Sequence, residues 1–351
     1  MSTNSLQDGW RVADPLQHPE WDQWLAKFPT ATVFHTAAWT RVLTETYGHR
    51  PAFQAEFRNG YLASLLPVLE VASPVTGSRG VSLPFTDSCE PLLLAGTDPA
   101  PLYQRTLEYG RSRHWRYFEC RSRSAGWPEA SPSISFLSHV LNLSDSFDSL
   151  FRQLDSAVRR GIRKAGEAGL RVEFRQDAEA VETFYRLHCG TRRRHGVPPQ
   201  PNRFFRNIGR FVLEPGLGFV SLASTSGKTV AAAIFFHFGK TAIYKFGASD
   251  YRFQSLRPNN LLMWESIKRC ADLGCSRLNF GRTSAANEGL RRFKLSFGAS
   301  EQSLDYCKYD FRLGKFVLDH DLAEGWHNSI FRCLPAPLLR LAGKLLYPHL
   351  S

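Results

Sequence analysis

Apolar residues recur along the chain in an order that predicts alternating helices and strands in two similar halves. In the first half, helical spacing predicts helices over residues 19–28 and 36–47. Thr36 stands where a helix N-cap belongs, in the segment Phe34-His35-Thr36-Ala37-Ala38-Trp39. The remaining elements expected in this half are strands at 52–57, 61–69 and 81–85, a helix at 101–112, and strands at 115–120 and 136–143.

The second half repeats this order. A strand at 172–174 and a long helix at 178–194 precede three strands at 218–223, 229–238 and 242–248. Short turns at Ser226-Gly227 and Gly239-Lys240 make these three strands an antiparallel meander. A helix at 259–273, a strand at 277–280, a short basic helix and a strand at 304–311 complete the half. The pattern predicts an α+β fold in which two halves, each a mostly antiparallel sheet flanked by helices, repeat one order of elements. Order alone leaves open whether the halves are tandem copies of one domain or converged on the same order.

Composition indicates a packed globular protein, because hydrophobic residues make up 43% and charged residues 22% of the chain. The formal net charge of +12 favours anionic partners. These include tRNA, nucleotide-sugar phosphates, the pyrophosphate of coenzyme A and an anionic membrane surface. Charge alone does not choose among them.

The sequence features that report on compartment all favour a reduced, cytoplasmic protein. The first residues lack the basic start and apolar core of a signal peptide, and the apolar runs are too short to span a bilayer. The seven cysteines are scattered and form no C-x-x-C pair, so we expect neither a disulfide framework nor a metal site.

The C-terminal segment 329–347 carries leucines on one helical face, with Arg340 and Lys344 among them. The simplest interpretation is an amphipathic helical tail docked on the body. The alternative is a peripheral contact with the inner face of an anionic membrane.

Three groups of residues are candidates for chemistry. Asp87 and Glu90 are two carboxylates in a loop after an expected strand, suited to accept a proton from an attacking group; the alternative is an ordinary acidic turn. Arg192, Arg193, Arg194 and His195 end a helix ahead of Gly196 and two prolines, which suggests an anion pocket, although the helix dipole explains one or two of them.

Lys294 is the third candidate. Its neighbours Phe293, Leu295 and Phe297 predict a partly desolvated ammonium that must pair or lower its pKa. Such a group can hold a phosphate or stabilise an oxyanion. The alternative is a surface lysine whose stem lies along apolar neighbours.

Three segments together resemble the second half of the Fem-type aminoacyltransferases. They are the helix beginning at Asn259-Asn260-Leu261, the strand Arg277-Leu278-Asn279-Phe280-Gly281 and the motif Phe293-Lys294-Leu295-Ser296-Phe297-Gly298. They are equally similar to the acetyltransferase group linked to bacterial exopolysaccharide synthesis. Both belong to the GNAT-like superfamily. The resemblance implies a first GNAT-like domain over 1–145, a second over 146–314 and a helical tail over 315–351. It also implies a catalytic role for Lys294.

The resemblance leaves the acyl donor open. GNAT domains that use coenzyme A normally carry a Gly-rich turn that cradles the pyrophosphate, and residues 251–260 lack that glycine pattern. The phosphate-binding candidates there are Arg252, Arg257, Asn259 and Asn260. Further substrate-binding candidates are Lys245, Arg282 and Arg292.

We expect an enzyme that holds no cofactor tightly and moves an acetyl or longer acyl group from coenzyme A or a carrier protein to an amine or hydroxyl. The acceptor would be a phosphate-bearing or lipid-linked precursor of the cell envelope or of an exopolysaccharide. The first alternative is a Fem-type transfer from aminoacyl-tRNA to a peptidoglycan-like precursor. The second is a non-catalytic GNAT-like binding module of a polysaccharide assembly system.

Overall fold

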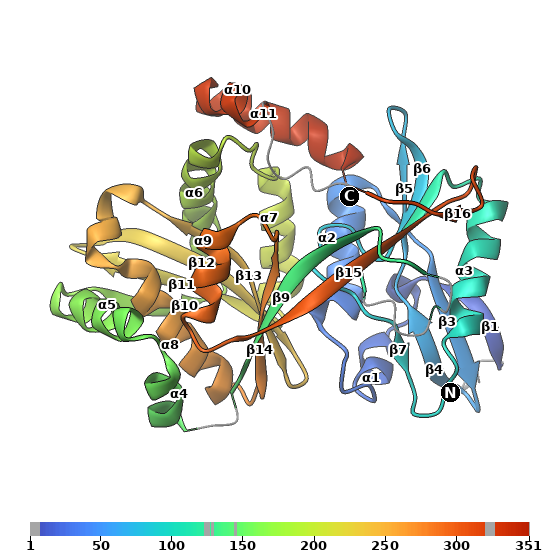
Figure 1. Cartoon of the computed structure of the whole chain (residues 1–351), viewed down its shortest axis with the longest axis horizontal. Coiled ribbons are helices and arrows are strands. Elements are labelled where there is room, and N and C mark those ends of the chain that lie inside the picture. The colour runs from blue at the N-terminus through green and yellow to red at the C-terminus, as the bar shows by residue number, and fades with distance from the viewer. Residues whose placement is uncertain (1–7, 123–126, 128–129, 144–145, 320–326, 351) are drawn as a thin grey trace. The chain divides into compact units, whose positions relative to one another are not determined.

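The computed structural model describes residues 8–122, 127, 130–143, 146–319 and 327–350. These residues form two compact units (Figure 1). The first unit consists of Met1–Phe136, Ser303–Asp321 and Pro348–Ser351, and the second of Leu137–Gln302 and Leu322–Tyr347. The division by contacts therefore differs from the one expected at residues 145 and 314, because the chain returns to the first unit at Ser303.

The first unit contains two groups of paired strands. An antiparallel sheet has the order β1 (Gly9–Ala13), β3 (Phe53–Arg58), β4 (Tyr61–Leu66), β7 (Leu92–Leu93). The second group has the order β2 (Arg50–Pro51), β5 (Leu69–Ser73), β6 (Gly77–Val81), β8 (Tyr117–Cys120), β15 (Ser300–Asp310), β16 (Lys315–Phe316). The helices are α1 (Trp21–Leu25), α2 (Ala37–Tyr47) and α3 (Ala100–Ser112).

The entry to α2 confirms the expected cap, since the Thr36 side chain accepts the Trp39 N–H. His35 just before it is buried and neutral. Its Nδ1 accepts the Thr32 N–H at 3.1 Å, and its Nε2 donates to the Glu90 carbonyl at 2.9 Å. Burial lowers the pKa of His35 to about 4.

The strand expected at 81–85 is wrong. Strand β6 ends at Val81, and Leu83 and Phe85 have φ values of 59° and 61°. These left-handed conformations cannot continue a strand. The apolar run expected as one strand over 61–69 is also divided, between β4 and the start of β5.

The second unit is built on a sheet with the order β10 (Arg171–Arg175), β11 (Gly218–Thr225), β12 (Lys228–Phe238), β13 (Thr241–Ser249), β14 (Arg277–Thr283), β9 (Ile134–Asn142). Strands β10 to β13 are antiparallel, as predicted for the meander. Strand β14 runs parallel to β13 and antiparallel to β9.

Helices cover both faces of this sheet. They are α4 (Phe147–Gln153), α5 (Ser156–Glu167), α6 (Ala178–His195), α7 (Asn202–Ile208), α8 (Pro258–Asp272) and α9 (Glu288–Leu295). Helix α8 packs Met263 and Ile267 into a core with Ala233 and other alternate residues of β12. Helix α6 covers the opposite face, where Phe184 contacts Phe246.

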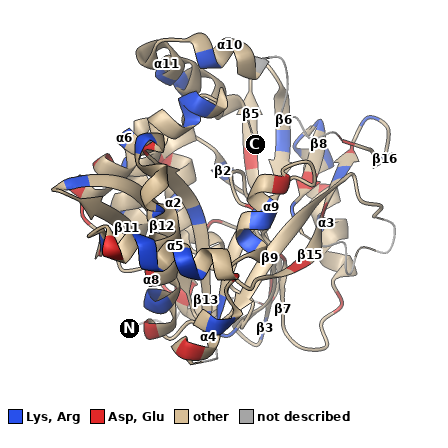
Figure 2. Cartoon of the chain, turned by 60° about the vertical axis from the view of Figure 1, so that its left-hand side comes forward, with Lys and Arg blue, Asp and Glu red and all other residues tan. Residues whose placement is uncertain are grey.

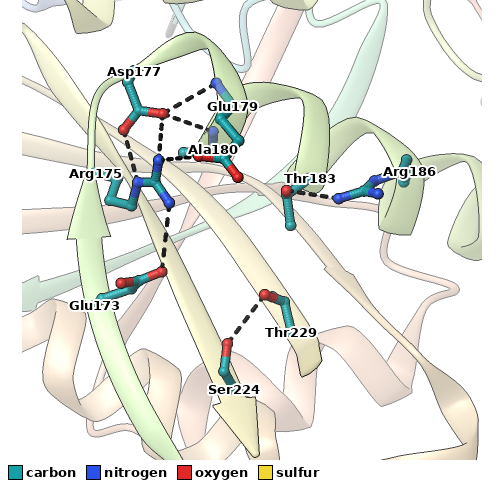
Figure 3. Close-up of polar contacts among 9 residues, drawn as sticks. All are labelled: Glu173, Arg175, Asp177, Glu179, Ala180, Thr183, Arg186, Ser224 and Thr229. Atoms are coloured by element: carbon teal, nitrogen blue, oxygen red, sulfur yellow. Dashed lines mark hydrogen bonds and ion pairs between the residues drawn. The ribbon is translucent and has the colours of Figure 1, made fainter. Parts of the chain in front are cut away.

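An ion-pair network fixes the start of α6 (Figure 3). Asp177 caps the helix by accepting the N–H groups of Glu179 and Ala180, each at 3.1 Å. Arg175 binds the Asp177 carboxylate through two nitrogens, each at 2.7 Å, and reaches Glu179 at 2.7 Å. The long helix therefore leaves β10 in a defined direction.

The predicted C-terminal helical tail is confirmed as α10 (His327–Cys333) and α11 (Ala336–Leu346). Helix α11 docks closely on the loop after α6. A Cβ atom added to Gly343 would lie 2.0 Å from the Pro199 carbonyl oxygen, so only glycine allows this approach. Tyr347, just past α11, accepts a hydrogen bond from Arg192 at 2.7 Å.

Candidate functional site

The central parallel strands of the second unit separate part-way along their length. Strands β13 and β14 pair over three residues, from Thr241 with Arg277 to Ile243 with Asn279, although both continue beyond this point. On its other side, β14 has an irregularity between Asn279 and Arg282. Residues of this bulge take other hydrogen-bond partners, since the Gly281 N–H donates to the Asn279 Oδ1 at 2.7 Å.

Lys294 of α9 binds this bulge. Its Nζ donates to the carbonyl oxygen of Gly281 at 2.7 Å and to that of Arg282 at 3.0 Å. Lys294 is 2% exposed, so the desolvation expected from its neighbours is nearly complete and the alternative of a surface lysine is wrong. The prediction that desolvation forces the ammonium to pair is confirmed.

A buried histidine lies beside this lysine. His139 of β9 places Nε2 3.0 Å from Glu301, which also binds Arg291 at 2.7 and 2.8 Å. Burial, and then the nearby charge of Lys294, lower the pKa of His139. Its buried Nδ1 has no hydrogen-bond partner among the described residues. This cluster was not predicted, since nothing in the spacing of the sequence links residues 139 and 301.

A cavity of about 560 Å³ lies between α5, the start of α8 and α9. Its lining includes the basic residues Arg160, Lys164, Arg257 and Arg292. We call these four the basic cluster. All four are exposed, and within the described part of the chain none of them has a carboxylate in ion-pair contact. Figure 2 shows Lys and Arg on α5 and α9. Asp155 is the one carboxylate in the described lining.

The start of α8 opens into the same cavity. Arg257 at the N-cap is left-handed, with φ 59°, and its side chain makes no capping bond to the described residues. A helix N-terminus carries unpaired N–H groups and a positive dipole, so it favours an anion. Asn260 of the first turn also lines the cavity and lies against Gly161, where an added Cβ atom would be 3.0 Å from its side chain. Glycine at 161 therefore permits close packing of α5 on α8.

A second cavity, of about 250 Å³, lies against β12 and β13. Its apolar lining includes Ala232, Leu262 and Phe293, and no carboxylate occurs among its described lining residues. Its polar lining residues are Thr191, Arg194, His195, Tyr244, Ser249 and Asn259. Burial raises the pKa of Tyr244 to about 12, so its hydroxyl stays protonated.

The three arginines at the end of α6 have different contacts. Arg192 binds the Tyr347 hydroxyl and the Pro198 carbonyl, so it fastens the tail. Arg193 is exposed. Arg194 lines the second cavity, with its guanidinium 5.5 Å from the centre of the Tyr251 ring.

The other predicted site residues lie outside both described linings. Arg252 forms an ion pair with Asp250 at 2.6 Å, and Lys245 lies over the Phe246 ring at 5.5 Å. Arg282 is exposed on β14. In the first unit, Glu90 is exposed and Asp87 is half-buried, with its backbone carbonyl accepting the Tyr306 hydroxyl. The predicted residues that do line a cavity are Arg257, Asn260 and Arg292 in the larger, and Arg194, His195 and Asn259 in the smaller.

Potential metal ligands stay apart in this fold. Across the described ranges, no group of three or more His, Cys, Asp or Glu residues is arranged to hold a metal ion. In the same part of the chain, every helix is too short or too polar to traverse a bilayer.

Part of the second unit matches a known protein family. Residues 152–295 match the model of the Acetyltransferase (GNAT) domain family. The sequence matches none of the curated proteins with which it was compared. The matched region contains β10 to β14 and every described lining residue of the two cavities except Ser296. His139 and Glu301 lie outside it.

Solved structures share the fold at low identity. A structure described as FemX has a TM-score of 0.68 at 15% identity, over 84% of this chain and 96% of that one. A DUF2156 domain of the lysylphosphatidylglycerol synthetase type from Agrobacterium fabrum has a TM-score of 0.55 at 12% identity, over 82% and 91%. A tandem GNAT protein from the clavulanic acid biosynthesis pathway has a TM-score of 0.53 at 9% identity, over 87% and 98%.

Proposed function

Starting from a chain that carries a GNAT-type acetyltransferase domain within a Fem-like tandem fold, we propose an acyltransferase that holds its donor by phosphate groups in the basic cavity. The observation that carries this proposal is the convergence of the basic cluster on the N-terminus of α8. The reaction class is inferred from the match to the acetyltransferase domain, and the type of donor is inferred from the charges that line the cavity.

The charges of the cavity suit a polyphosphate. Arginine guanidinium groups bind phosphate oxygens through two parallel hydrogen bonds, and helix N-terminal N–H groups add to this. The Gly-rich turn that usually supplies such contacts is missing between β13 and α8. Arg257, Arg160 and Lys164 offer side-chain cations to the same region.

The second cavity favours a neutral acyl group. Its described lining combines apolar and polar residues, and it contains Arg194 without a carboxylate. An acetyl or longer acyl group would suffer no electrostatic cost there, whereas the ammonium of an aminoacyl group would lack a counter-charge. Acetyl-coenzyme A or a longer acyl-coenzyme A is therefore the preferred donor.

The reaction would be direct transfer. An amine or hydroxyl of the acceptor attacks the thioester carbonyl, the new C–N or C–O bond forms, the C–S bond breaks, and the acceptor proton is lost to a base as the thiolate leaves. Asp87 and Glu90 remain our predicted proton acceptors. The contacts of Lys294 support a positioning role, in which it holds the β14 bulge where the two strands separate.

The proposed acceptor is a phosphate-bearing or lipid-linked precursor of the cell envelope or of an exopolysaccharide. Aminoacyl-tRNA remains the second candidate donor, with a peptidoglycan-like acceptor. The fold shared with FemX and with the DUF2156 domain favours this second candidate.

Titration calorimetry with acetyl-coenzyme A, coenzyme A and aminoacyl-tRNA tests the donor site. The test variant is Arg160→Gln with Lys164→Gln, and the control is Arg163→Gln, an exposed arginine of the same helix outside the described lining. We expect donor affinity to fall about tenfold or more in the test variant, equivalent to about 1.4 kcal/mol. Equal binding by both variants, or binding of none of the three ligands, would overturn the proposal.

A further inference from the structure

The outer side of α11 exposes a row of large aliphatic side chains. Leu338, Leu341 and Leu345 are 51%, 50% and 61% exposed, and Ile330 of α10 is 52% exposed. The spacing of the three leucines places them on one face of the helix. The other side of α11 is already docked, since Leu339 and Gly343 are buried. The exposed row is therefore not explained by packing against the body of the second unit.

The charge of this segment has one sign. Residues 327–350 contain Arg332, Arg340 and Lys344 and no aspartate or glutamate. All three basic side chains are exposed. Basic residues beside an exposed apolar face are typical of helices that lie in the interface of an anionic bilayer.

We propose that this surface, the tail face, binds anionic phospholipid bilayers. The tail face consists of Ile330, Leu338, Leu341 and Leu345 together with Arg340 and Lys344. The leucines enter the boundary between headgroups and acyl chains, and the two cations contact the lipid phosphates. The binding is reversible, because one short amphipathic helix buries little apolar surface.

A second copy of the chain fits this surface less well. A two-fold dimer through the tail face would bring the same cations of both chains into one interface. The segment supplies no carboxylate to pair with them. Lipid phosphates supply the missing negative charge.

This inference does not depend on the proposed donor. If both hold, the tail face keeps the enzyme beside acceptors that are anchored in lipid. A failure of donor binding in the calorimetry leaves the tail face untouched, and a failure of the tail face leaves the donor site untouched.

The test is co-sedimentation of the full chain with phosphatidylcholine vesicles that contain or lack phosphatidylglycerol, at low and high salt. The apolar test variant is Leu341→Gln with Leu345→Gln. Its matched control is Leu313→Gln with Leu318→Gln, two leucines of the first unit that are 61% and 81% exposed. The charge variant is Arg340→Gln with Lys344→Gln.

We expect wild-type protein and the control to bind the phosphatidylglycerol vesicles. The apolar test variant should bind about tenfold more weakly. The charge variant should lose the salt dependence and the preference for phosphatidylglycerol. Analytical ultracentrifugation of the same variants follows self-association. Absence of vesicle binding, equal binding by test and control variants, or a dimer that only the apolar test variant abolishes would overturn the proposal.

Discussion

The ammonium of Lys294 donates to the carbonyl oxygen of Gly281 at 2.7 Å, and this bond joins α9 to the bulge of β14. The bulge begins at Asn279, the residue at which pairing between β13 and β14 ends. One buried cation therefore stabilises the local geometry at the point where the sheet opens. Through this bond, the position of α9 is coupled to the point at which β13 and β14 separate.

Replacing Lys294 with Met should destabilise the fold. The substitution keeps much of the stem but leaves two buried carbonyl groups without their charged donor. We expect the free energy of unfolding to fall by about 3 kcal/mol, because each lost bond to a charged group is worth about 1.5–3 kcal/mol. Urea unfolding measures this. The control Lys268→Met removes an ion pair with Glu265 whose side chains are 31% and 30% exposed, and should cost less than about 1 kcal/mol.

Turnover of the folded Lys294→Met protein separates two roles. A fall of about a hundredfold or more would support the predicted oxyanion role. A smaller change together with the expected instability would leave Lys294 as a positioning residue. Unchanged stability would show that the two carbonyl groups of the bulge do not depend on this ammonium.

Substitution of the three arginines at the end of α6 should give three different results. Arg192→Gln should loosen the tail, because it removes the bond to Tyr347, and cost about 1–2 kcal/mol. Arg193→Gln should be nearly neutral. Arg194→Gln should weaken substrate binding with little effect on stability. Limited proteolysis, urea unfolding and KM measurements distinguish them. Equal effects from all three would contradict the division.

Gly247 of β13 lines the second cavity, and replacing it with Ala should close that cavity. The added Cβ atom would lie 1.9 Å from the hydroxyl oxygen of Tyr244, so the tyrosine must move. We expect activity to fall about tenfold or more. A second change, Tyr244→Phe, removes the obstructing oxygen and should restore part of the activity. A double-mutant cycle on kcat/KM measures the coupling, and strictly additive effects would show that the two residues act independently.

Buried histidines should make the fold sensitive to mild acid. The folded pKa of His35 is about 4, against an ordinary value of 6.5. Between these values the unfolded chain takes up a proton that the folded chain does not, so stability falls as pH drops from about 6.5 toward 4. The loss is on the order of 3 kcal/mol for this group. His49 and His188 shift in the same direction.

Urea midpoints measured between neutral and mildly acid pH test this. The variant His35→Gln cannot titrate, so its stability should change less steeply with pH than that of the wild type. Parallel pH profiles of the two proteins would exclude His35 as a source of the acid sensitivity.

Local pattern predicted the regular elements of the second unit well. The meander follows from alternating apolar residues and Gly-containing turns, and α8 and β14 follow from helical spacing and an apolar run. The region after Val81 could not be predicted in this way. Leu83 and Phe85 continue the apolar alternation of a strand, but their left-handed backbone is a tertiary outcome.

The site was less predictable, because the role of a residue depends on contacts with residues far away in the sequence, and residues of the same type therefore differ in role. Arg192 and Arg194 belong to one triplet, yet the partner of Arg192 lies 155 positions away. Lys294 is buried because a strand bulge turns two carbonyl groups toward it, and no residue spacing encodes that bulge. His139 acquires its surroundings only from the folded sheet.

The glycine at position 343 is where α11 approaches the Pro199 carbonyl most tightly, since an added Cβ atom would lie 2.0 Å from that oxygen. Its approach to the Pro199 carbonyl allows a single helix face to lie inward, and the leucine row is thereby aimed outward. The change Gly343→Ala would move the helix without altering one exposed side chain. If the tail face binds a bilayer as proposed, this buried glycine would also control the angle between the second unit and the membrane.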